Sequence, residues 1–424
     1  MSPILAKMLI RTPIARLLPS VKRLPADGGA FLHYYSDRIL STLRADLRQA
    51  ADLMEARGPD VIDLGSGNPC FDLVASGSTK LPADRRGWPQ PWGQPELRQA
   101  VADLLATDLR LNLNPAEEVL ITHGASGALA AALDAFVNPG DRVVLLDPTS
   151  PVFSFFLRYR RARILWVPTW MEAGRTRFQM KSMVKALAHA RMIVLAAPNN
   201  PTGGFMSAED LDQIAWWARR RDVLIVNDMV FDRFLYDGRP MTIATMAAAR
   251  SRTITVGSTS KGHGLAAHRV GWLTGNRHLV APSAIAAAMQ APFVSNLSQQ
   301  VALSALRADE TAFRALHGEF DSRRHYAFER LESMGLRPAW PLGAFFLWLS
   351  VKDLGLDGGE FARRLDQAKK VAVWPGELFG PSGEHHVRLS YAAEDGRLRE
   401  GLGRMAEFVR ELRLRPSEAR KAAA

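Results

Sequence analysis

The sequence predicts an α/β fold whose large domain is built on a mostly parallel sheet covered by helices, with a smaller α+β domain beside it. Three observations predict this fold. Short apolar runs rich in β-branched residues recur through the middle of the chain, helical stretches separate these runs, and shorter strand-like runs mixed with helices follow toward the C-terminus. A chain of 424 residues, 47% of them hydrophobic, is long enough to bury two cores.

The predicted strands of the large domain are apolar at nearly every position, which is typical of strands covered by helices on both faces. An alanine-rich helix is predicted at 126–136, and a turn separates it from the next strand. The predicted strands are 119–122, 142–146, 164–167, 192–196, 223–226 and 253–256. Because ligands of such folds bind at the carboxyl ends of the strands, we expect the functional residues at that edge.

The smaller domain is predicted from a change of pattern after about residue 295. A long helical stretch there leads to short strands at 343–348, 371–374 and 387–391, and the segment 61–71 is expected to complete the same domain. We therefore divide the chain into a basic amphipathic extension (1–30), a first part of the small domain (31–75), a large domain (76–314) and a second part of the small domain (315–424).

Charge and cysteine content exclude several classes of function. The net charge of +11 is dispersed, and no helix-turn-helix, RNA-binding or zinc-ligand spacing is present, so we expect no nucleic-acid partner and no metal. Cys70 is the single cysteine, which excludes an internal disulfide and favours a reducing, cytoplasmic location. The extension 1–30 is expected to pack on the protein or on a partner subunit, and contact with an anionic membrane or an organelle presequence are the alternatives.

Lys261 ends the motif Ser258-Thr259-Ser260-Lys261 directly after a predicted strand, and Arg269 follows eight positions later. A lysine at the end of a strand is ordinarily a solvated surface residue. Here hydroxyls and an arginine accompany it, and such groups bind a phosphate while the amine captures an aldehyde. The combination is typical of a site in which a lysine holds a phosphorylated cofactor as a Schiff base.

Three further motifs lie at predicted strand ends. The turn-rich segment 197–204 contains two consecutive asparagines before Pro-Thr-Gly, which an ordinary surface loop does not explain. Asp228 ends an otherwise apolar run, and a buried carboxylate needs a partner, which a pyridinium nitrogen would supply. The segment 124–127 (Gly-Ala-Ser-Gly) opens a helix whose free N–H groups and dipole favour a phosphate.

Together these motifs resemble the fold-type I pyridoxal-phosphate (PLP) superfamily, specifically the class I/II aminotransferases. The resemblance covers nearly the whole chain after the extension, and it includes 63–69 near the start and 379–381 and 388–390 near the end. It implies a sheet of the seven-stranded type, PLP as the cofactor, and a homodimer with active sites shared between subunits. The implied reaction moves an amino group from an amino acid to a 2-keto acid.

The resemblance also implies roles for individual residues. Lys261 would form the Schiff base and then act in proton transfer, and Asp228 would pair with the pyridine nitrogen and keep it protonated. Arg388 would bind the substrate α-carboxylate with help from the backbone near Gly67. Asn200 would border the substrate and donate to the phenolic oxygen of the cofactor. The residues implied to hold the phosphate are Ala125, Ser126, Ser258, Ser260 and Arg269.

Three positions depart from the family pattern. A tyrosine usually follows the aspartate by three positions and donates to the phenolic oxygen, but this chain has Phe231, which would raise the pKa of the Schiff base. The aromatic residue that usually covers the cofactor ring is Ser150, and Phe153 or Phe155 could cover the ring instead. The tyrosine that reaches the phosphate from the partner subunit is Trp88, whose indole N–H can still donate.

These departures leave more than one reaction open. We expect a specialised aminotransferase, and the alternatives are another PLP reaction on amino acids (a lyase, decarboxylase or oxidase) or a non-catalytic PLP-binding regulatory protein. Dicarboxylate-specific relatives place an arginine shortly before a Ser-Asn pair. This chain has Ala291 before Ser295-Asn296, so we expect neutral, aromatic or less common amino donors. His263 and His268, which follow the lysine closely, are expected to have structural roles.

Overall fold

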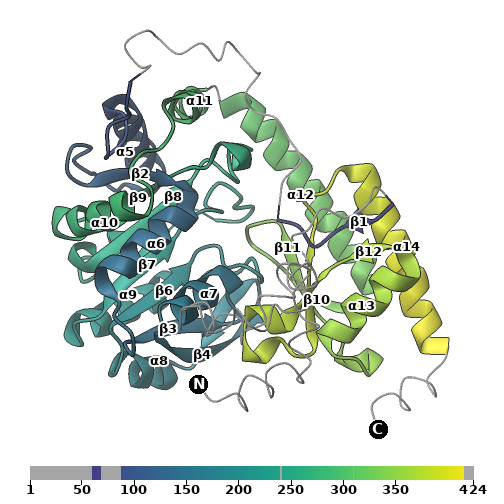
Figure 1. Ribbon diagram of the computed structural model, residues 1–424. Helices are drawn as coiled ribbons and strands as arrows, with labels where there is room; N and C mark the ends of the chain where they lie inside the picture. The colour runs from purple at the N-terminus through teal and green to yellow at the C-terminus, as the bar shows by residue number, and fades with distance from the viewer. Residues whose placement is uncertain (1–59, 68–86, 239–240, 309, 415–424) are drawn as a thin grey trace, which may run out of the picture.

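The structure is a computed structural model that describes residues 60–67, 87–238, 241–308 and 310–414. Figure 1 shows two bodies side by side, a large sheet with its helices on the left and a smaller sheet with its helices on the right. This confirms the predicted α/β class with a smaller α+β part. The extension 1–30 and Cys70 lie outside the described residues, and the predicted domain boundaries stay predictions. None of the described helices combines the length and the apolar character that a membrane crossing needs.

The large sheet has eight strands within the described residues, in the order β2–β9–β8–β7–β6–β3–β4–β5. They are β2 (Val119–His123), β3 (Arg142–Asp147), β4 (Arg163–Glu172), β5 (Arg175–Phe178), β6 (Met192–Ala196), β7 (Leu224–Asp228), β8 (Thr253–Ser258) and β9 (Val270–Gly275). The central strands are parallel, whereas β9 runs antiparallel between β2 and β8. The expected seven-stranded arrangement is present, and β5 extends it as the antiparallel partner of β4.

Alternate side chains of each central strand enter two different cores, which explains why the strands are apolar throughout. Val143 and Leu145 of β3 belong to one core, and Val144 and Leu146 belong to the other. The first core is covered by α6 (Gly124–Phe136), α7 (Pro151–Tyr159) and α10 (Arg277–Gln290). The second is covered by α8 (Met180–Leu187) and α9 (Ala208–Arg220), while α5 (Pro95–Leu109) and α11 (Asn296–Leu306) pack at the β2 edge.

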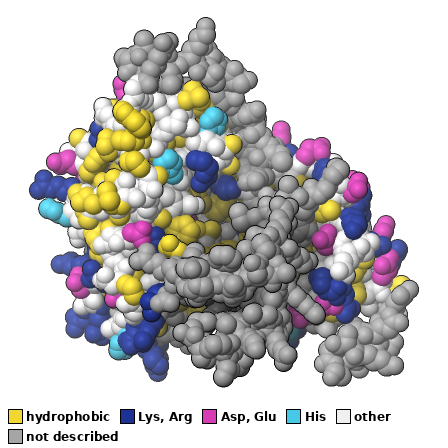
Figure 2. All heavy atoms as spheres, in the orientation of Figure 1, with side chains coloured by type: hydrophobic (Ala, Val, Ile, Leu, Met, Phe, Trp, Pro, Cys, Tyr) yellow, Lys and Arg dark blue, Asp and Glu magenta, His cyan; other side chains and the backbone are white. Residues whose placement is uncertain are grey.

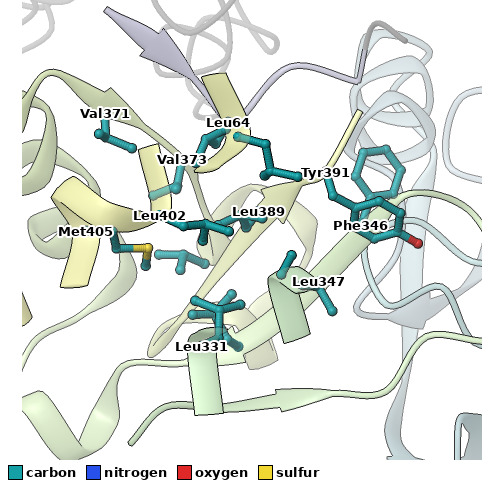
Figure 3. Packing of buried hydrophobic residues seen from close by; sticks show 14 of the residues in the cluster. Leu64, Leu331, Phe346, Leu347, Val371, Val373, Leu389, Tyr391, Leu402 and Met405 are labelled. Atoms are coloured by element: carbon teal, nitrogen blue, oxygen red, sulfur yellow. The ribbon is translucent and has the colours of Figure 1, made fainter. Parts of the chain in front are cut away.

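The smaller sheet is antiparallel and has the order β10–β11–β14–β13. Its strands are β10 (Arg337–Ala339), β11 (Phe346–Ser350), β13 (Trp374–Pro375) and β14 (His386–Ser390). Its helices are α12 (Glu310–Ser333), α13 (Gly358–Lys369) and α14 (Asp395–Leu414). Beside this sheet, β1 (Ile62–Asp63) pairs in parallel with β12 (Val371–Ala372), so the first described segment packs against the C-terminal part of the chain. Figure 3 shows the shared core, where Leu347, Leu389 and Leu402 lie together.

Helix α12 connects the two bodies, and it crosses from the upper left to the right in Figure 1. Leu316 and Phe320 of this helix belong to the core of the smaller body. Its first residue, Glu310, instead forms an ion pair with Arg233, which follows β7 of the large sheet. The first residue of α12 is therefore bonded to the large body, and the following turns pack in the core of the smaller body.

Gly271 of β9 determines how closely α6 approaches the large sheet. A Cβ atom at this position would lie 2.4 Å from the carbonyl carbon of Gly124 and 2.6 Å from the nitrogen of Ala125. Both are backbone atoms at the start of α6, so no side chain fits between the strand and the helix. The position of the first turn of α6 thus depends on the missing side chain of this glycine.

We expect Gly271→Ala to destabilise the protein by about 1–3 kcal/mol, because the added methyl group forces backbone atoms apart. Denaturant unfolding of the purified variant measures the change in the free energy of unfolding. The control is Gly403→Ala on α14, where a Cβ atom would meet nothing within 4 Å and alanine favours the helix by about 1 kcal/mol. If the two variants are equally stable, the close contact between β9 and α6 is not a constraint on the fold.

Candidate active site

Lys261 follows β8 in a tight turn, and its amine reaches toward the segment after β1. Its Nζ donates a hydrogen bond of 2.5 Å to the carbonyl oxygen of Gly67. Burial lowers the pKa of Lys261 to about 8, and the nearby charges of Arg388 and Arg269 act in the same direction. Near neutral pH this amine is therefore uncharged far more often than an exposed lysine, which suits a nucleophile or a base.

A group of anion-binding donors surrounds the start of α6. Arg269 has a left-handed backbone conformation (φ 54°), and a Cβ atom at Gly124 would lie 2.4 Å from its Nη2 atom. Its Nη1 lies 3.4 Å from Ser260 Oγ, and Ser260 N donates to Ser258 Oγ at 3.2 Å. Hydroxyls, a guanidinium and helix N–H groups therefore converge on one place. The sequence-predicted residues that meet there are Ala125, Ser126, Ser258, Ser260 and Arg269.

Asp228 ends β7, the neighbour of the strand that leads to the lysine. Its carboxylate accepts a hydrogen bond from Val230 N at 3.0 Å, and no cation within the described residues forms an ion pair with it. Burial raises the pKa of Asp228 to about 7, and the hydrogen bond from Val230 opposes this rise. The residue as a whole is half-buried rather than fully enclosed, so the N–H group of a ligand can approach it.

Arg388, on β14, is 3% exposed and contacts both the large sheet and the first described segment. Its Nη1 donates to Asn200 Oδ1 at 2.8 Å, and its Nη2 donates to the carbonyl oxygen of Gly65 at 2.6 Å. The guanidinium lies 4.1 Å from the ring centroid of Phe346 and 4.5 Å from that of Trp374. Burial lowers its pKa to about 9. The buried Nε has no partner within the described residues, which leaves a donor for an anionic ligand.

Phe231, at the position where the family usually has a tyrosine, belongs to the core of the smaller body. Its ring makes edge-to-face contacts with Phe345 and Phe346, at centroid distances of 5.3 and 5.4 Å. Phe346 in turn lies under Arg388. The ring at 231 therefore supports the arginine side of the site through an apolar contact and supplies no hydroxyl.

The structure separates the two candidates that the sequence offered for an aromatic cover near Ser150. Ser150 directly precedes α7, and its side chain makes no capping hydrogen bond. Phe153 is fully buried in the large core and has no surface left for a ligand. Phe155 instead packs against a small cluster of Trp348, Leu378 and Phe379, against which Trp374 also packs, and Trp374 lies beside Arg388. Of the two phenylalanines, only Phe155 lies on the site side of the helix.

Trp88 lies apart from the buried group formed by the other predicted residues. It is 87% exposed, and its indole packs against Phe293 with ring centroids 5.4 Å apart. An indole this exposed is unusual for a surface residue without a partner. Its free face is open to contact with another chain.

Sequence reasoning missed three residues that shape the site, namely Gly65, Phe346 and Trp374. Gly65 supplies a carbonyl oxygen to Arg388, and the two aromatic rings enclose the guanidinium. The sequence marks the two aromatic residues only as parts of strands, because their contacts with Arg388 join distant parts of the chain. No group of three or more His, Cys, Asp or Glu side chains that could hold a metal occurs in the described part of the chain.

The sequence model of the family described as Aminotransferase class I and II matches residues 59–405. An aspartate aminotransferase from Pyrococcus abyssi is 30% identical over 388 residues, which cover 89% of this chain and 99% of that protein. The aromatic-amino-acid aminotransferase 2 from Thermococcus litoralis is 31% identical over 395 residues, with coverages of 89% and 99%. The crystal structure of an aromatic aminotransferase from Pyrococcus horikoshii matches with a TM-score of 0.78 at 29% identity, over 86% of this chain and 99% of that one. The chain therefore belongs to the class I/II aminotransferases, and it is a transferase with the fold-type I architecture.

Proposed function

We propose that this aminotransferase binds pyridoxal phosphate through Lys261 and moves amino groups from neutral or aromatic amino acids to 2-keto acids. The observation that carries the proposal is the shared segment 65–67, whose carbonyl oxygens accept hydrogen bonds from both Lys261 and Arg388. An amine for the cofactor and a guanidinium for a carboxylate thus border one space. The family match favours amino transfer over the lyase, decarboxylase and oxidase alternatives.

The side chains fit the cofactor group by group. Arg269 and the hydroxyls beside it have the donors that a phosphate requires. The carboxylate of Asp228, which accepts one backbone hydrogen bond and has no ion-pair partner among the described residues, suits a ring N–H. Asn200 Oδ1 accepts a hydrogen bond from Arg388, so the amide nitrogen Nδ2 of Asn200 can donate to a phenolic oxygen. When bound, PLP supplies an aldehyde that condenses with amines and a ring that withdraws electrons from the substrate α-carbon.

Lys261 and Arg388 supply the remaining functions of the site. Arg388 binds the substrate α-carboxylate, which gives its buried Nε a partner and orients the α-carbon toward the lysine. Lys261, with a pKa of about 8, accepts the proton from the α-carbon and returns it later in the cycle. Asp228 keeps a hydrogen bond to the ring N–H while the proton moves. The aromatic residues around Arg388 exclude water from its charge.

The preference for a neutral or aromatic donor rests on two features. Ala291 stands where dicarboxylate-specific relatives carry an arginine, and it directly follows α10. Phe155 and Trp374 form part of an aromatic cluster next to Arg388, so the walls near the carboxylate site are apolar. The two relatives described above are named for different amino-acid substrates, and their sequence identities to this chain are nearly equal. Sequence similarity alone therefore does not select a donor.

We further propose a homodimer that places Trp88 at the partner's active site. Large hydrophobic side chains are exposed along α10 and α11 near this tryptophan, namely Ile285, Met289 and Leu297. Figure 2 shows hydrophobic side chains gathered on the left of the molecule, where Figure 1 places α10. Exposed apolar area of this kind mostly marks a contact surface between proteins. A second copy of the chain fits because the interface would bring its tryptophan to the phosphate.

The function is tested with a panel of amino donors. Purified protein with PLP is mixed with a 2-keto acid and, in turn, neutral, aromatic and dicarboxylic amino acids or diamines, and keto-acid release is measured. We expect kcat/KM for aspartate to be at least about tenfold below that of the best neutral or aromatic donor, because a buried distal carboxylate has no arginine partner. Lys261→Ala is the control, and this variant should release no keto acid from any donor. Aspartate as the best donor contradicts the inference from Ala291, and no product from any donor contradicts the proposed function.

The lowered pKa of Lys261 predicts how cofactor binding depends on pH. The amine must be uncharged to attack an aldehyde, so the rate at which PLP binds to cofactor-free protein should rise with pH and be half-maximal near the lysine pKa of about 8. Arg388→Met removes a positive neighbour and should raise the midpoint, although burial, the larger cause of the shift, remains. Stopped-flow absorbance measures both profiles. A midpoint that stays or falls in the variant contradicts the assignment of the two cations to one site.

The dimer predicts that a charge on the exposed apolar face produces inactive monomers. Met289→Glu should shift sedimentation toward a monomer and abolish most transamination, since the partner's tryptophan is lost from the site. Trp216→Glu is the matched control, because Trp216 is also an exposed large hydrophobic residue but lies on α9, which covers the opposite face of the sheet. A wild-type protein that sediments as an active monomer would contradict the shared site.

A further inference from the structure

The side chain of Arg233 lies across the turn that carries the lysine. A Cβ atom at Gly262 would lie 2.6 Å from Arg233 Cδ, so the side chain rests directly on the backbone next to Lys261. Arg233 Nη1 is 2.7 Å from His263 Nε2, two residues after the lysine. One side chain thus contacts two consecutive residues of the turn.

His263 receives this hydrogen bond as a neutral side chain. It is 3% exposed, and burial, followed by the charge of Arg233, lowers its pKa to about 3. Because a guanidinium can only donate, the histidine Nε2 accepts and its proton sits on Nδ1. The bond therefore keeps this direction near neutral pH.

The second terminal nitrogen of the Arg233 guanidinium is bonded to α12. This atom, Nη2, donates to Glu310, and the guanidinium lies 3.8 Å from the ring centroid of Phe313. Both partners belong to the first turns of α12, and Phe313 packs against the core of the smaller body. A single, mostly buried side chain thus connects the lysine turn to the helix that joins the two bodies.

We propose that Arg233 is a positioning residue that holds the turn of Lys261 in a fixed position relative to α12. Because α12 packs in the smaller body, the position of the Lys261 amine is thereby linked to the body that carries Arg388. The proposal rests on the proposed function, since it assigns the amine and the guanidinium to one reaction. The planar fork of an arginine can hold His263 and Glu310 at once, which the single ammonium of a lysine cannot do in the same geometry. Within the described residues, the amine of Lys261 has one hydrogen bond, to the carbonyl oxygen of Gly67.

A competing explanation is that Arg233 only neutralises acids. Asp108 and Asp232 both lie close enough for the charge of Arg233 to lower their pKa, against a larger effect of burial that raises it. Arg233→Lys separates the two explanations, because it keeps the positive charge and removes the two-armed contact. Arg233→Ala removes both.

The kinetic test compares these variants with a matched control. Arg323→Ala removes an arginine of α12 that has a similar side-chain exposure (12%, against 10% for Arg233), an ion pair of 3.4 Å to Glu319 and a ring contact of 5.2 Å with Phe320. We expect both Arg233 variants to lower kcat by about tenfold to a hundredfold with little change in KM for the donor, because the amine is displaced from the α-carbon. Arg323→Ala should change the melting temperature and leave kcat near the wild-type value. Recovery of kcat in Arg233→Lys would show that only the charge matters, which overturns the proposal.

A second readout does not use the cofactor or the reaction. Hydrogen–deuterium exchange of cofactor-free protein reports the amides of the lysine turn, where Gly264 N is bonded to Lys261 O and Leu265 N to Thr259 O. We expect Glu310→Ala, at the α12 end of the link, to speed exchange in this turn, whereas Arg323→Ala does not. Unchanged exchange in Glu310→Ala would overturn the coupling even if the wild type proves an active enzyme. A wild type that neither binds PLP nor releases keto acid would overturn the proposed function, and the exchange result would still decide whether the link exists.

Discussion

The candidate active site depends on one short backbone segment, 64–67, which bonds to parts of the protein that are far apart in the sequence. Leu64 O accepts a hydrogen bond of 2.7 Å from Ser390 N, at the end of the strand that carries the arginine. The next carbonyls of the segment accept from Arg388 and Lys261. The relative place of the two cations therefore depends on backbone geometry, because both side chains donate to carbonyl oxygens of this one segment.

This arrangement also connects the electrostatics of the two cations. The charge of Arg388 is one of the causes that lower the pKa of Lys261, after burial. A carboxylate bound to Arg388 cancels much of that effect, so an occupied site favours the protonated amine more than an empty one does. Asp228 stands at the end of β7 with a raised pKa of its own. The pKa of Lys261 thus responds to the charge of Arg388, whereas the pKa of Asp228 is raised by burial alone.

Most strands of the large sheet could be predicted from the sequence, and the candidate site residues could be proposed from it, because both leave a signal within a short stretch of chain. Strands covered on both faces are apolar at every position, and residues such as Asp228 stand out because they interrupt that pattern at a strand end. Strands β5 and β9 are absent from the predicted strands. The four residues of β5 are mostly polar and pair only with β4. The six residues of β9 include two glycines, which weaken the strand pattern. The contacts of Trp374 and Gly65 with Arg388 were missed for a different reason. They join distant segments, and no pattern within a short window records them.

The three departures from the family pattern have different surroundings in this chain. Phe231 is part of an apolar core, Ser150 precedes a helix, and Trp88 is on the surface. Each position therefore has its own environment and can be understood separately. The loss of the hydroxyl at 231 accompanies a hydrophobic contact with Phe346, which leads directly to the arginine.

The contact between Trp374 and Gly65 restricts how this site can change during evolution. A Cβ atom at Gly65 would lie 2.3 Å from Trp374 Cδ1 and 2.9 Å from its Nε1, so the indole fills the space that any other residue at 65 would need. A homologue that keeps the tryptophan must keep the glycine, whereas one with a small residue at 374 is free to vary at 65. The two positions are 309 apart in the chain, and they are expected to change together or not at all.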